Sequence, residues 1–150
     1  MKLTRTIANV LRSKRENRIL SISPDQTVYV AIKKMAEYGV GALLVMSGNQ
    51  LLGIISERDY ARKVVLKGYL SKDIPVREIM TTGIISVDLR RPIDECMAIM
   101  TEHRFRHLPV IENDIVVGVV SQGDVVKWII SEQEEVIHEL EGYIVGSYPA

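Results

Sequence analysis

The sequence predicts an α+β fold in which two copies of one β-α-β-β-α unit pack into a single compact module. The chain has 150 residues, about the size of one compact domain. Residues 19–65 align without gaps on residues 84–130, and the apolar pattern matches along both segments. Such repeats are expected to pack around a pseudo-twofold axis, because neither copy buries its apolar face alone. Identical residues occupy the paired positions Ser21/Ser86, Met35/Met100, Glu37/Glu102, Leu43/Leu108, Val45/Val110, Gly53/Gly118, Ser56/Ser121 and Asp59/Asp124.

Each unit is expected to begin with a short extended run, Ile19–Ile22 or Ile84–Val87, followed by an amphipathic helix. Thr27 is expected to cap the first of these helices, and Pro92 suits a first-turn position of the second. Apolar residues recur in both helices at i, i+3, i+4 and i+7, which is typical of a helix with one face on a core. Cys96 lies in such a stripe and is therefore expected to be a buried small hydrophobe. The stripes are Val28, Ala31, Ile32 and Met35 in the first copy and Ile93, Cys96, Met97 and Met100 in the second.

Two apolar strands in a hairpin are expected after each of these helices. Their continuous apolar character predicts strands that are covered on both faces. A second helix then opens at Ser56 or Ser121, and the last helix is expected to reach about Glu141. We place the first repeat, with an N-terminal extension, at residues 1–75, and the second repeat, with a C-terminal helix, at residues 76–150. The expected hairpin strands are Ala42–Met46 with Leu51–Ile55, and Leu108–Ile111 with Ile115–Val120.

Composition and missing motifs argue against several functional classes. Nineteen Lys plus Arg balance nineteen Asp plus Glu, whereas nucleic-acid-binding proteins usually carry a basic excess. No apolar run approaches the roughly 18 residues that a membrane helix needs. We therefore expect no nucleic-acid partner, no membrane partner and a cytoplasmic location. Phosphate-loop and serine-hydrolase motifs are absent, and no cluster of metal ligands occurs, so we expect no enzyme activity, no catalytic residue and no metal site.

A repeated motif marks the start of each second helix. Residues 53–59 read Gly-Ile-Ile-Ser-Glu-Arg-Asp, and residues 118–124 read Gly-Val-Val-Ser-Gln-Gly-Asp. A Ser followed three residues later by Asp is typical of a capping box, in which both side chains satisfy free N–H groups at the helix start. The same geometry suits an anion or a ribose, because helix N-termini attract negative charge and a carboxylate accepts hydrogen bonds from ribose hydroxyls. The motif alone leaves both interpretations open.

These residues resemble a tandem pair of CBS domains, the Bateman module. The resemblance covers roughly residues 7–130. It rests on the repeated motif, on Arg-His-Leu-Pro-Val at residues 106–110, and on Val-Arg-Glu-Ile-Met-Thr at residues 76–81. It implies a stand-alone, non-enzymatic module that often forms homodimers. It also implies clefts that bind AMP, ADP, ATP, NAD or S-adenosylmethionine.

The resemblance also assigns roles to individual residues. Ribose hydroxyls would be held by Asp59 and Asp124, with Ser56 and Ser121 nearby. Phosphates would be contacted by Arg106 and His107, and the base would be lined by Met80 and Thr81. Arg58 would reach phosphate, although a solvated surface arginine is an equally good interpretation.

The two copies differ in ways that predict unequal clefts. The first copy carries Gly41-Ala42 where the second has Arg106-His107. The first copy also contains a basic insertion at residues 12–18, from which Lys14 or Arg18 would bind a further phosphate group. A solvated charged loop is the alternative for this insertion.

Taken together, the sequence favours a regulatory module that requires no cofactor. It would sense an adenine nucleotide in clefts between the repeats and signal to an unidentified protein partner. The alternative is a purely structural dimerisation module with vestigial clefts. A homodimer is expected in either case, because Trp128 and Ile130 add apolar surface that one small domain does not fully bury.

Overall fold

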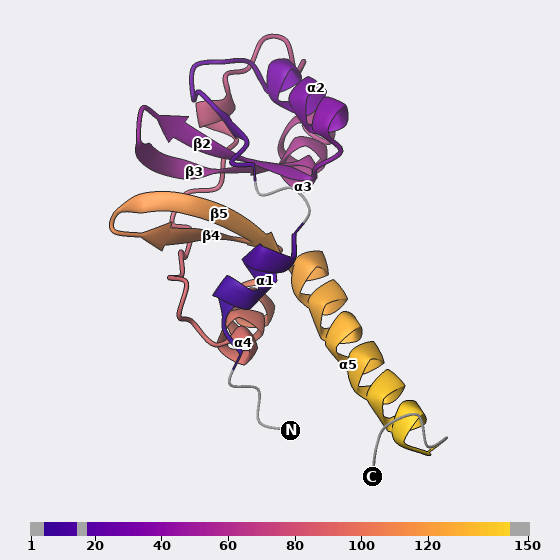
Figure 1. The fold of residues 1–150 in the computed structure, drawn as a ribbon. Coiled ribbons are helices and arrows are strands. Elements are labelled where there is room, and N and C mark those ends of the chain that lie inside the picture. The colour runs from indigo at the N-terminus through magenta and orange to yellow at the C-terminus, as the bar shows by residue number, and fades with distance from the viewer. Residues whose placement is uncertain (1–4, 15–17, 145–150) are drawn as a thin grey trace.

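The computed structural model describes residues 5–14 and 18–144, and Arg15, Glu16 and Asn17 of the basic insertion lie outside these ranges. In chain order the elements are α1 (Ile7–Ser13), β1 (Ser21–Ile22), α2 (Val28–Tyr38), β2 (Ala42–Ser47), β3 (Gln50–Ser56), α3 (Glu57–Tyr60), α4 (Ile93–His103), β4 (His107–Glu112), β5 (Ile115–Ser121) and α5 (Gln122–Ile144). Helices α2 and α3 cover the outer side of one sheet, and α1, α4 and α5 lie on the outer side of the other (Figure 1). The predicted α+β fold is confirmed. Among the described residues, no helix is long and apolar enough to cross a membrane.

The two sheets follow the repeat, with one difference. Strands β2 and β3 form an antiparallel hairpin to which β1 adds in parallel, and β4 and β5 form the matching hairpin. The predicted strand Ile84–Val87 is wrong, because this segment makes only an isolated bridge at Val87. In the first repeat the Leu44 N–H donates to the Leu20 carbonyl at 3.1 Å. The equivalent of Leu44 is Pro109, which has no N–H, so the second ladder cannot extend in the same way.

Capping residues define where the first helix of each repeat begins and ends. Thr27 caps α2 as predicted, since its Oγ1 accepts a hydrogen bond from the Val30 N–H at 3.3 Å. Pro92 stands immediately before the first residue of α4, not inside its first turn. Helix α2 ends at Gly39, with φ of 65°, and α4 ends at Arg104, with φ of 57°. The left-handed conformation suits glycine and disfavours a side chain such as that of Arg104.

The second helices of the two repeats differ in length and geometry. Helix α3 has 4 residues and continues into a π-helical turn at Ala61–Val65. Helix α5 has 23 residues, runs slightly beyond the predicted end near Glu141, and extends away from the body of the molecule (Figure 1).

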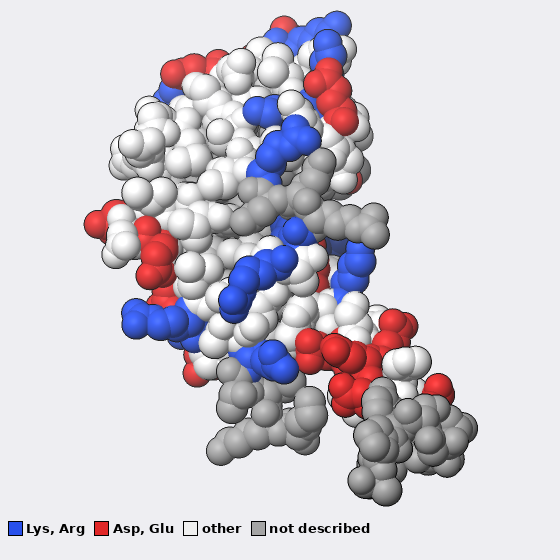
Figure 2. All heavy atoms as spheres, viewed as in Figure 1, with Lys and Arg blue, Asp and Glu red and all other residues white. Residues whose placement is uncertain are grey.

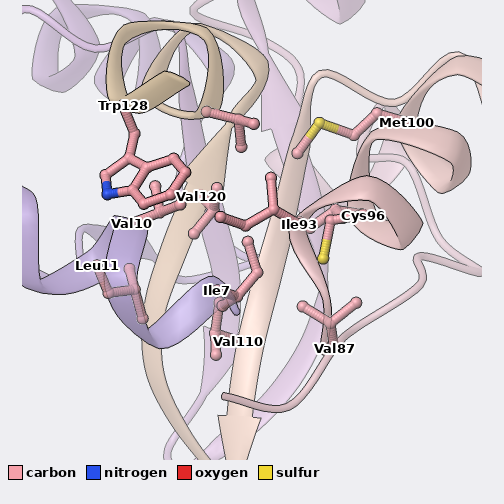
Figure 3. Close-up of a cluster of buried hydrophobic side chains, with 12 residues drawn as sticks. Ile7, Val10, Leu11, Val87, Ile93, Cys96, Met100, Val110, Val120 and Trp128 are labelled. Atoms are coloured by element: carbon pink, nitrogen blue, oxygen red, sulfur yellow. The ribbon is translucent and has the colours of Figure 1, made fainter. Parts of the chain in front are cut away.

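Each repeat has its own core, but packing crosses the predicted boundary between residues 75 and 76. Ile7, Val10 and Leu11 of α1 are buried in the core of the second repeat, where Figure 3 shows them. Conversely, Val76 and Ile79 are buried in the core of the first repeat. Each core is therefore completed by a segment that lies in the sequence range of the other repeat.

Trp128 and Cys96 belong to the core of the second repeat. Trp128 of α5 lies beside Val10 and Val120 in Figure 3, and only 7% of it is exposed. Its side chain is therefore unavailable as an interface contact, whereas Ile130 is 50% exposed. Cys96 is fully buried, as expected of a small hydrophobe, and burial raises the pKa of its thiol to about 11.

The two sheets meet through a third apolar cluster. Leu44 and Ile54 from one sheet are buried with Val116 from the other. This contact places the ends of β3 and β5, where the Ser–Asp motifs begin, between the two repeats. The partly buried side chains packed against the cluster are Ala42, Met46, Leu51, Ile84, Ile111 and Val119.

Gly53 has no room for a side chain. A Cβ atom at this position would lie 2.6 Å from the Thr81 carbonyl oxygen, and the neighbouring Ile54 exchanges backbone hydrogen bonds of 3.0 and 2.8 Å with Thr81. Because that backbone cannot give way cheaply, we expect Gly53→Ala to lower the free energy of unfolding by about 1–3 kcal/mol, as measured by urea denaturation. In the control Gly41→Ala, the new Cβ would meet nothing within 4 Å. The control should change stability by less than about 1 kcal/mol, and equal costs for the two variants would contradict the prediction.

Candidate functional site

The repeated Ser–Asp motif folds as a capping box at the start of both α3 and α5. At α3 the Asp59 N–H donates to Ser56 Oγ at 3.2 Å, and the Ser56 N–H donates to Asp59 Oδ2 at 3.0 Å. At α5 the Asp124 N–H donates to Ser121 Oγ at 3.0 Å, and the Ser121 N–H donates to Asp124 Oδ2 at 2.9 Å. The capping interpretation is confirmed, and each carboxylate retains a second oxygen for other partners.

Both oxygens of Asp59 are already engaged. Its Oδ1 accepts a hydrogen bond from Thr81 Oγ1 at 3.1 Å and lies 3.0 Å from the Lys63 ammonium. Lys63 also donates to the Ile79 carbonyl at 2.9 Å, so it bridges the carboxylate and the segment that leads into the second repeat. Because a carboxylate has about four acceptor positions, a ligand hydroxyl at Oδ1 must displace Thr81 or Lys63.

Asp124 is held by a lysine from a distant part of the chain. Lys14, which follows α1, lies 3.0 Å from Asp124 Oδ2 and donates to the Val119 carbonyl at 2.8 Å. Burial opposes ionisation of Asp124, but the bonds from Ser121 and Lys14 outweigh it and hold the pKa of this carboxyl below its usual value. Among the described residues no donor bonds to Oδ1. No described residue therefore competes with a ligand hydroxyl for Oδ1 of this carboxylate.

A first cleft of about 410 Å³ opens between the start of α3 and the segment that precedes β4. Ser56, Asp59 and Thr81 lie on one side of it, and Arg106 and His107 come from the other repeat. The cleft therefore combines the carboxylate of one repeat with basic side chains of the other. Its remaining lining residues are Gly41, Ile54, Glu57, Arg58, Arg62, Lys63, Ile84, His103, Arg104 and Phe105.

A second cleft of about 270 Å³ opens between the start of α5 and the segment that precedes β2. Ser121 and Asp124 face Lys14 and Arg18 here. Gly41, Ile54 and His107 line both clefts, so the two clefts adjoin. Small or apolar residues complete the second cleft: Leu20, Gly39, Val40, Ala42, Leu43, Leu44 and Val119.

Burial and neighbouring charges shift the pKa values of two basic residues in the clefts. Burial is the main reason that the pKa of His107 lies below its usual value, with Lys14 and Arg106 adding to the effect and Asp124 opposing it. The pKa of Arg58 is also lowered, first by Arg106 and then by Arg62. Acidic side chains gather elsewhere: Figure 2 shows them over α5, whereas Lys and Arg side chains run down the middle of the same face.

The structure brings most of the sequence-predicted residues to these two clefts. Ser56, Arg58, Asp59, Thr81 and Arg106 line the first, Lys14, Arg18, Ser121 and Asp124 line the second, and His107 lines both. Met80 does not line either cleft. It packs against the core of the first repeat, close to Gly53.

Sequence reasoning missed several basic residues and one aromatic residue of the first cleft. Arg62 follows Arg58 by four residues, a spacing that puts both on one helix face, and this signal was available. Arg104 and Phe105 directly precede Arg106 in the sequence. Lys63 follows Asp59 by four residues, so the same spacing signal was available for this ion pair.

Comparison with known proteins identifies the family. The family model for the CBS domain matches residues 13–66 and again residues 76–131. The mitochondrial CBS domain-containing protein CBSX3 of Arabidopsis thaliana is 41% identical over 151 residues, covering 95% of this chain and 73% of the relative. The CBS domain-containing protein YhcV of Bacillus subtilis is 30% identical over 107 residues, covering 71% of this chain and 76% of the relative.

Solved structures agree with this match. A protein with CBS domains from Burkholderia ambifaria superposes with a TM-score of 0.83 at 48% identity, covering 85% of this chain and 96% of that one. A CBS-domain containing protein of Agrobacterium tumefaciens superposes with a TM-score of 0.76 at 32% identity, covering 81% of this chain and 97% of that one. The duplicated family match, the relatives and the shared fold show that this chain belongs to the CBS-domain family as a tandem pair, an arrangement that is generally a regulatory ligand-binding module.

Proposed function

We propose that this module senses adenine nucleotides, of the AMP, ADP, ATP or NAD type, in the two clefts between its repeats. One observation carries the proposal. Each cleft sets a Ser–Asp helix start from one repeat against the segment that precedes the first hairpin strand of the other repeat. The larger volume, about 410 Å³, lies within the range typical of small-molecule sites.

The lining offers a partner for each part of a nucleotide. In the second cleft no described residue donates to Oδ1 of Asp124, so this oxygen accepts from a ribose hydroxyl directly. In the first cleft a ribose hydroxyl must first displace Thr81 or Lys63 from Asp59. Apolar side chains flank these carboxylates and supply the flat surface that an adenine ring needs: Ile54, Ile84 and Phe105 in the first cleft, and Leu20, Val40 and Leu43 in the second. Arg106 binds the phosphates in the first cleft, and Lys14 and Arg18 bind them in the second.

Binding between the repeats also suggests how the module signals. A ligand that contacts both repeats stabilises the arrangement in which they are correctly spaced. A protein partner that prefers this arrangement then binds more tightly when the nucleotide is present, and thermodynamic linkage makes the effect reciprocal. No catalytic step is part of this proposal.

Self-association is the second part of the proposal, and exposed apolar side chains support it. Along α5, Val126 is 43%, Ile130 50%, Ile137 54% and Leu140 58% exposed. These residues recur at spacings of three, four and seven, so they form one stripe on the helix. We propose that a second copy of the chain covers this stripe.

The nucleotide proposal is tested by a thermal-shift panel of AMP, ADP, ATP, NAD and free adenine. At one hundred times Kd, a bound nucleotide adds about 2.7 kcal/mol of stability, which raises the melting temperature by roughly 5–10 °C. Adenine alone should give a smaller shift, because it lacks the ribose and phosphate contacts. Failure of all four nucleotides, with no nucleotide released from the purified protein on denaturation, would refute the proposal.

Substitution of the two aspartates separates ribose binding from helix capping. Asp59→Asn and Asp124→Asn each remove the charge, which should cost about 0.5–1 kcal/mol of stability through the helix dipole. If the carboxylate also holds a ribose, nucleotide affinity at that cleft should fall about ten- to a hundredfold in calorimetric titration.

The control for these two variants is Asp114→Asn in the β4–β5 turn, where φ is 63° and asparagine is well accommodated. The control should leave affinity unchanged. Unchanged affinity in all three variants would mean that both motif aspartates serve only as helix caps.

Self-association is tested by sedimentation equilibrium with nucleotide present. The wild-type protein should have twice the 16.9 kDa mass of one chain. Ile130→Glu should shift the protein towards monomer, because it places a charge in the apolar stripe. The matched control is Ile115→Glu, at a residue that is 64% exposed in the β4–β5 hairpin. A monomeric wild-type protein at high micromolar concentration is incompatible with this part of the proposal.

A further inference from the structure

Four arginines gather around the first cleft. Arg58 and Arg62 come from α3 and the π-helical turn of the first repeat, and Arg104 and Arg106 come from the segment between α4 and β4 of the second. Within the described part of the chain, none of the four forms an ion pair with a carboxylate.

The acids of the cleft do not neutralise this cluster. Asp59 is already paired with Lys63 at 3.0 Å, which leaves Glu57 as the other acid in the lining. The mutual repulsion is visible at Arg58, whose pKa is lowered first by Arg106, then by Arg62, and also by Arg104. In the absence of a ligand, solvent and salt ions screen these charges, and an anionic ligand in the cleft would replace them.

The cluster is not a by-product of the repeat. Under the internal alignment, Arg104 and Arg106 correspond to Gly39 and Gly41, which occupy the same place in the second cleft. Arg58 corresponds to Gly123. The same fold therefore accepts glycine at these three positions, and this arginine cluster belongs to the first cleft specifically.

Backbone conformation adds an independent observation at Arg104. This residue ends α4 with φ of 57°, where the first repeat uses Gly39 with φ of 65°. Glycine is the residue that helix ends of this kind favour, because a side chain is strained in the left-handed region. At Arg104 the chain therefore places a guanidinium beside the cleft at a backbone position that glycine would occupy with less strain.

We propose that the first cleft is a polyphosphate site, which prefers a nucleoside triphosphate over the corresponding monophosphate. Guanidinium groups bind phosphate oxygens through paired, charge-assisted hydrogen bonds, and every added phosphate brings further negative charge and further acceptors. Four convergent guanidiniums match a chain of phosphates, whereas one phosphate group leaves some of them unpaired. The adenosine part of the ligand rests on the function proposed above, but the polyphosphate part does not.

The test is calorimetric titration of the full chain with ATP, ADP, AMP, adenosine and inorganic triphosphate, in EDTA and at two salt concentrations. We expect ATP to bind at least about tenfold more tightly than AMP, and inorganic triphosphate to compete with ATP. Arg104→Gly and Arg106→Gly should each lower ATP affinity by about tenfold or more, with a smaller effect on AMP, and should weaken the salt dependence.

Stability measurements separate binding from folding. Arg104→Gly should leave the melting temperature of the ligand-free protein unchanged or raise it, because glycine relieves the strained φ. Loss of ATP affinity in a variant that is at least as stable as wild type cannot result from misfolding. The control Arg90→Gln removes an exposed arginine outside both clefts and should leave all affinities unchanged.

The outcomes distinguish the two proposals. If inorganic triphosphate binds through the arginines but nucleotides bind no better, the polyphosphate site stands and the adenine-nucleotide function fails. If AMP binds as tightly as ATP, or the arginine variants leave the ATP-to-AMP ratio unchanged, the polyphosphate proposal is overturned. Absence of binding by every probe overturns both.

Discussion

Face-to-face packing of the two sheets determines where the functional side chains of this protein lie. Leu44, Ile54 and Val116 form the buried contact between the sheets. Because Ile54 also lines both clefts, the same apolar contact that joins the repeats forms a wall of each cleft. The strand ends that carry Ser56 and Ser121 are thereby brought against the opposite repeat. A capping motif that would serve only its own helix becomes part of a composite cleft.

Each repeat also contributes a flanking segment to the core of the other repeat, which further holds the two repeats together. Helix α1 packs into the core of the second repeat, and Val76 and Ile79 pack into the core of the first. Two lysines join these segments to the motif carboxylates: Lys14 links the end of α1 to Asp124, and Lys63 links Asp59 to the Ile79 carbonyl. Each lysine therefore ties a segment that crosses the sequence boundary to the repeat whose core that segment completes.

The two repeats share a backbone arrangement but differ in the side chains that line their clefts. Matching backbone bonds hold the two helix starts, since the Glu57 N–H donates to the Gly41 carbonyl at 3.0 Å and the Gln122 N–H donates to the Arg106 carbonyl at 2.8 Å. The side chains at these equivalent positions nevertheless differ completely, with no side chain at Gly41 and a guanidinium at Arg106. The backbone at the two helix starts is therefore held in the same way, whereas the charge of the cleft side chains differs. This divergence concentrates arginines in the first cleft and leaves the second cleft smaller, at about 270 Å³ against about 410 Å³.

The sequence by itself determined the repeat, the order of its elements and the motif residues, because these depend on local periodicity and capping chemistry. Thr27 and the Ser–Asp pairs cap their helices as the sequence predicts, since such bonds join residues only three apart. Only the tertiary structure decided which residues meet. The pairing of Lys14 with Asp124, the burial of α1 in the second core and the approach of Arg58 to Arg106 all join residues far apart in the chain. The missing strand at Ile84–Val87 likewise reflects a long-range constraint, because its failure to extend is caused by the absent N–H of Pro109 on the neighbouring strand.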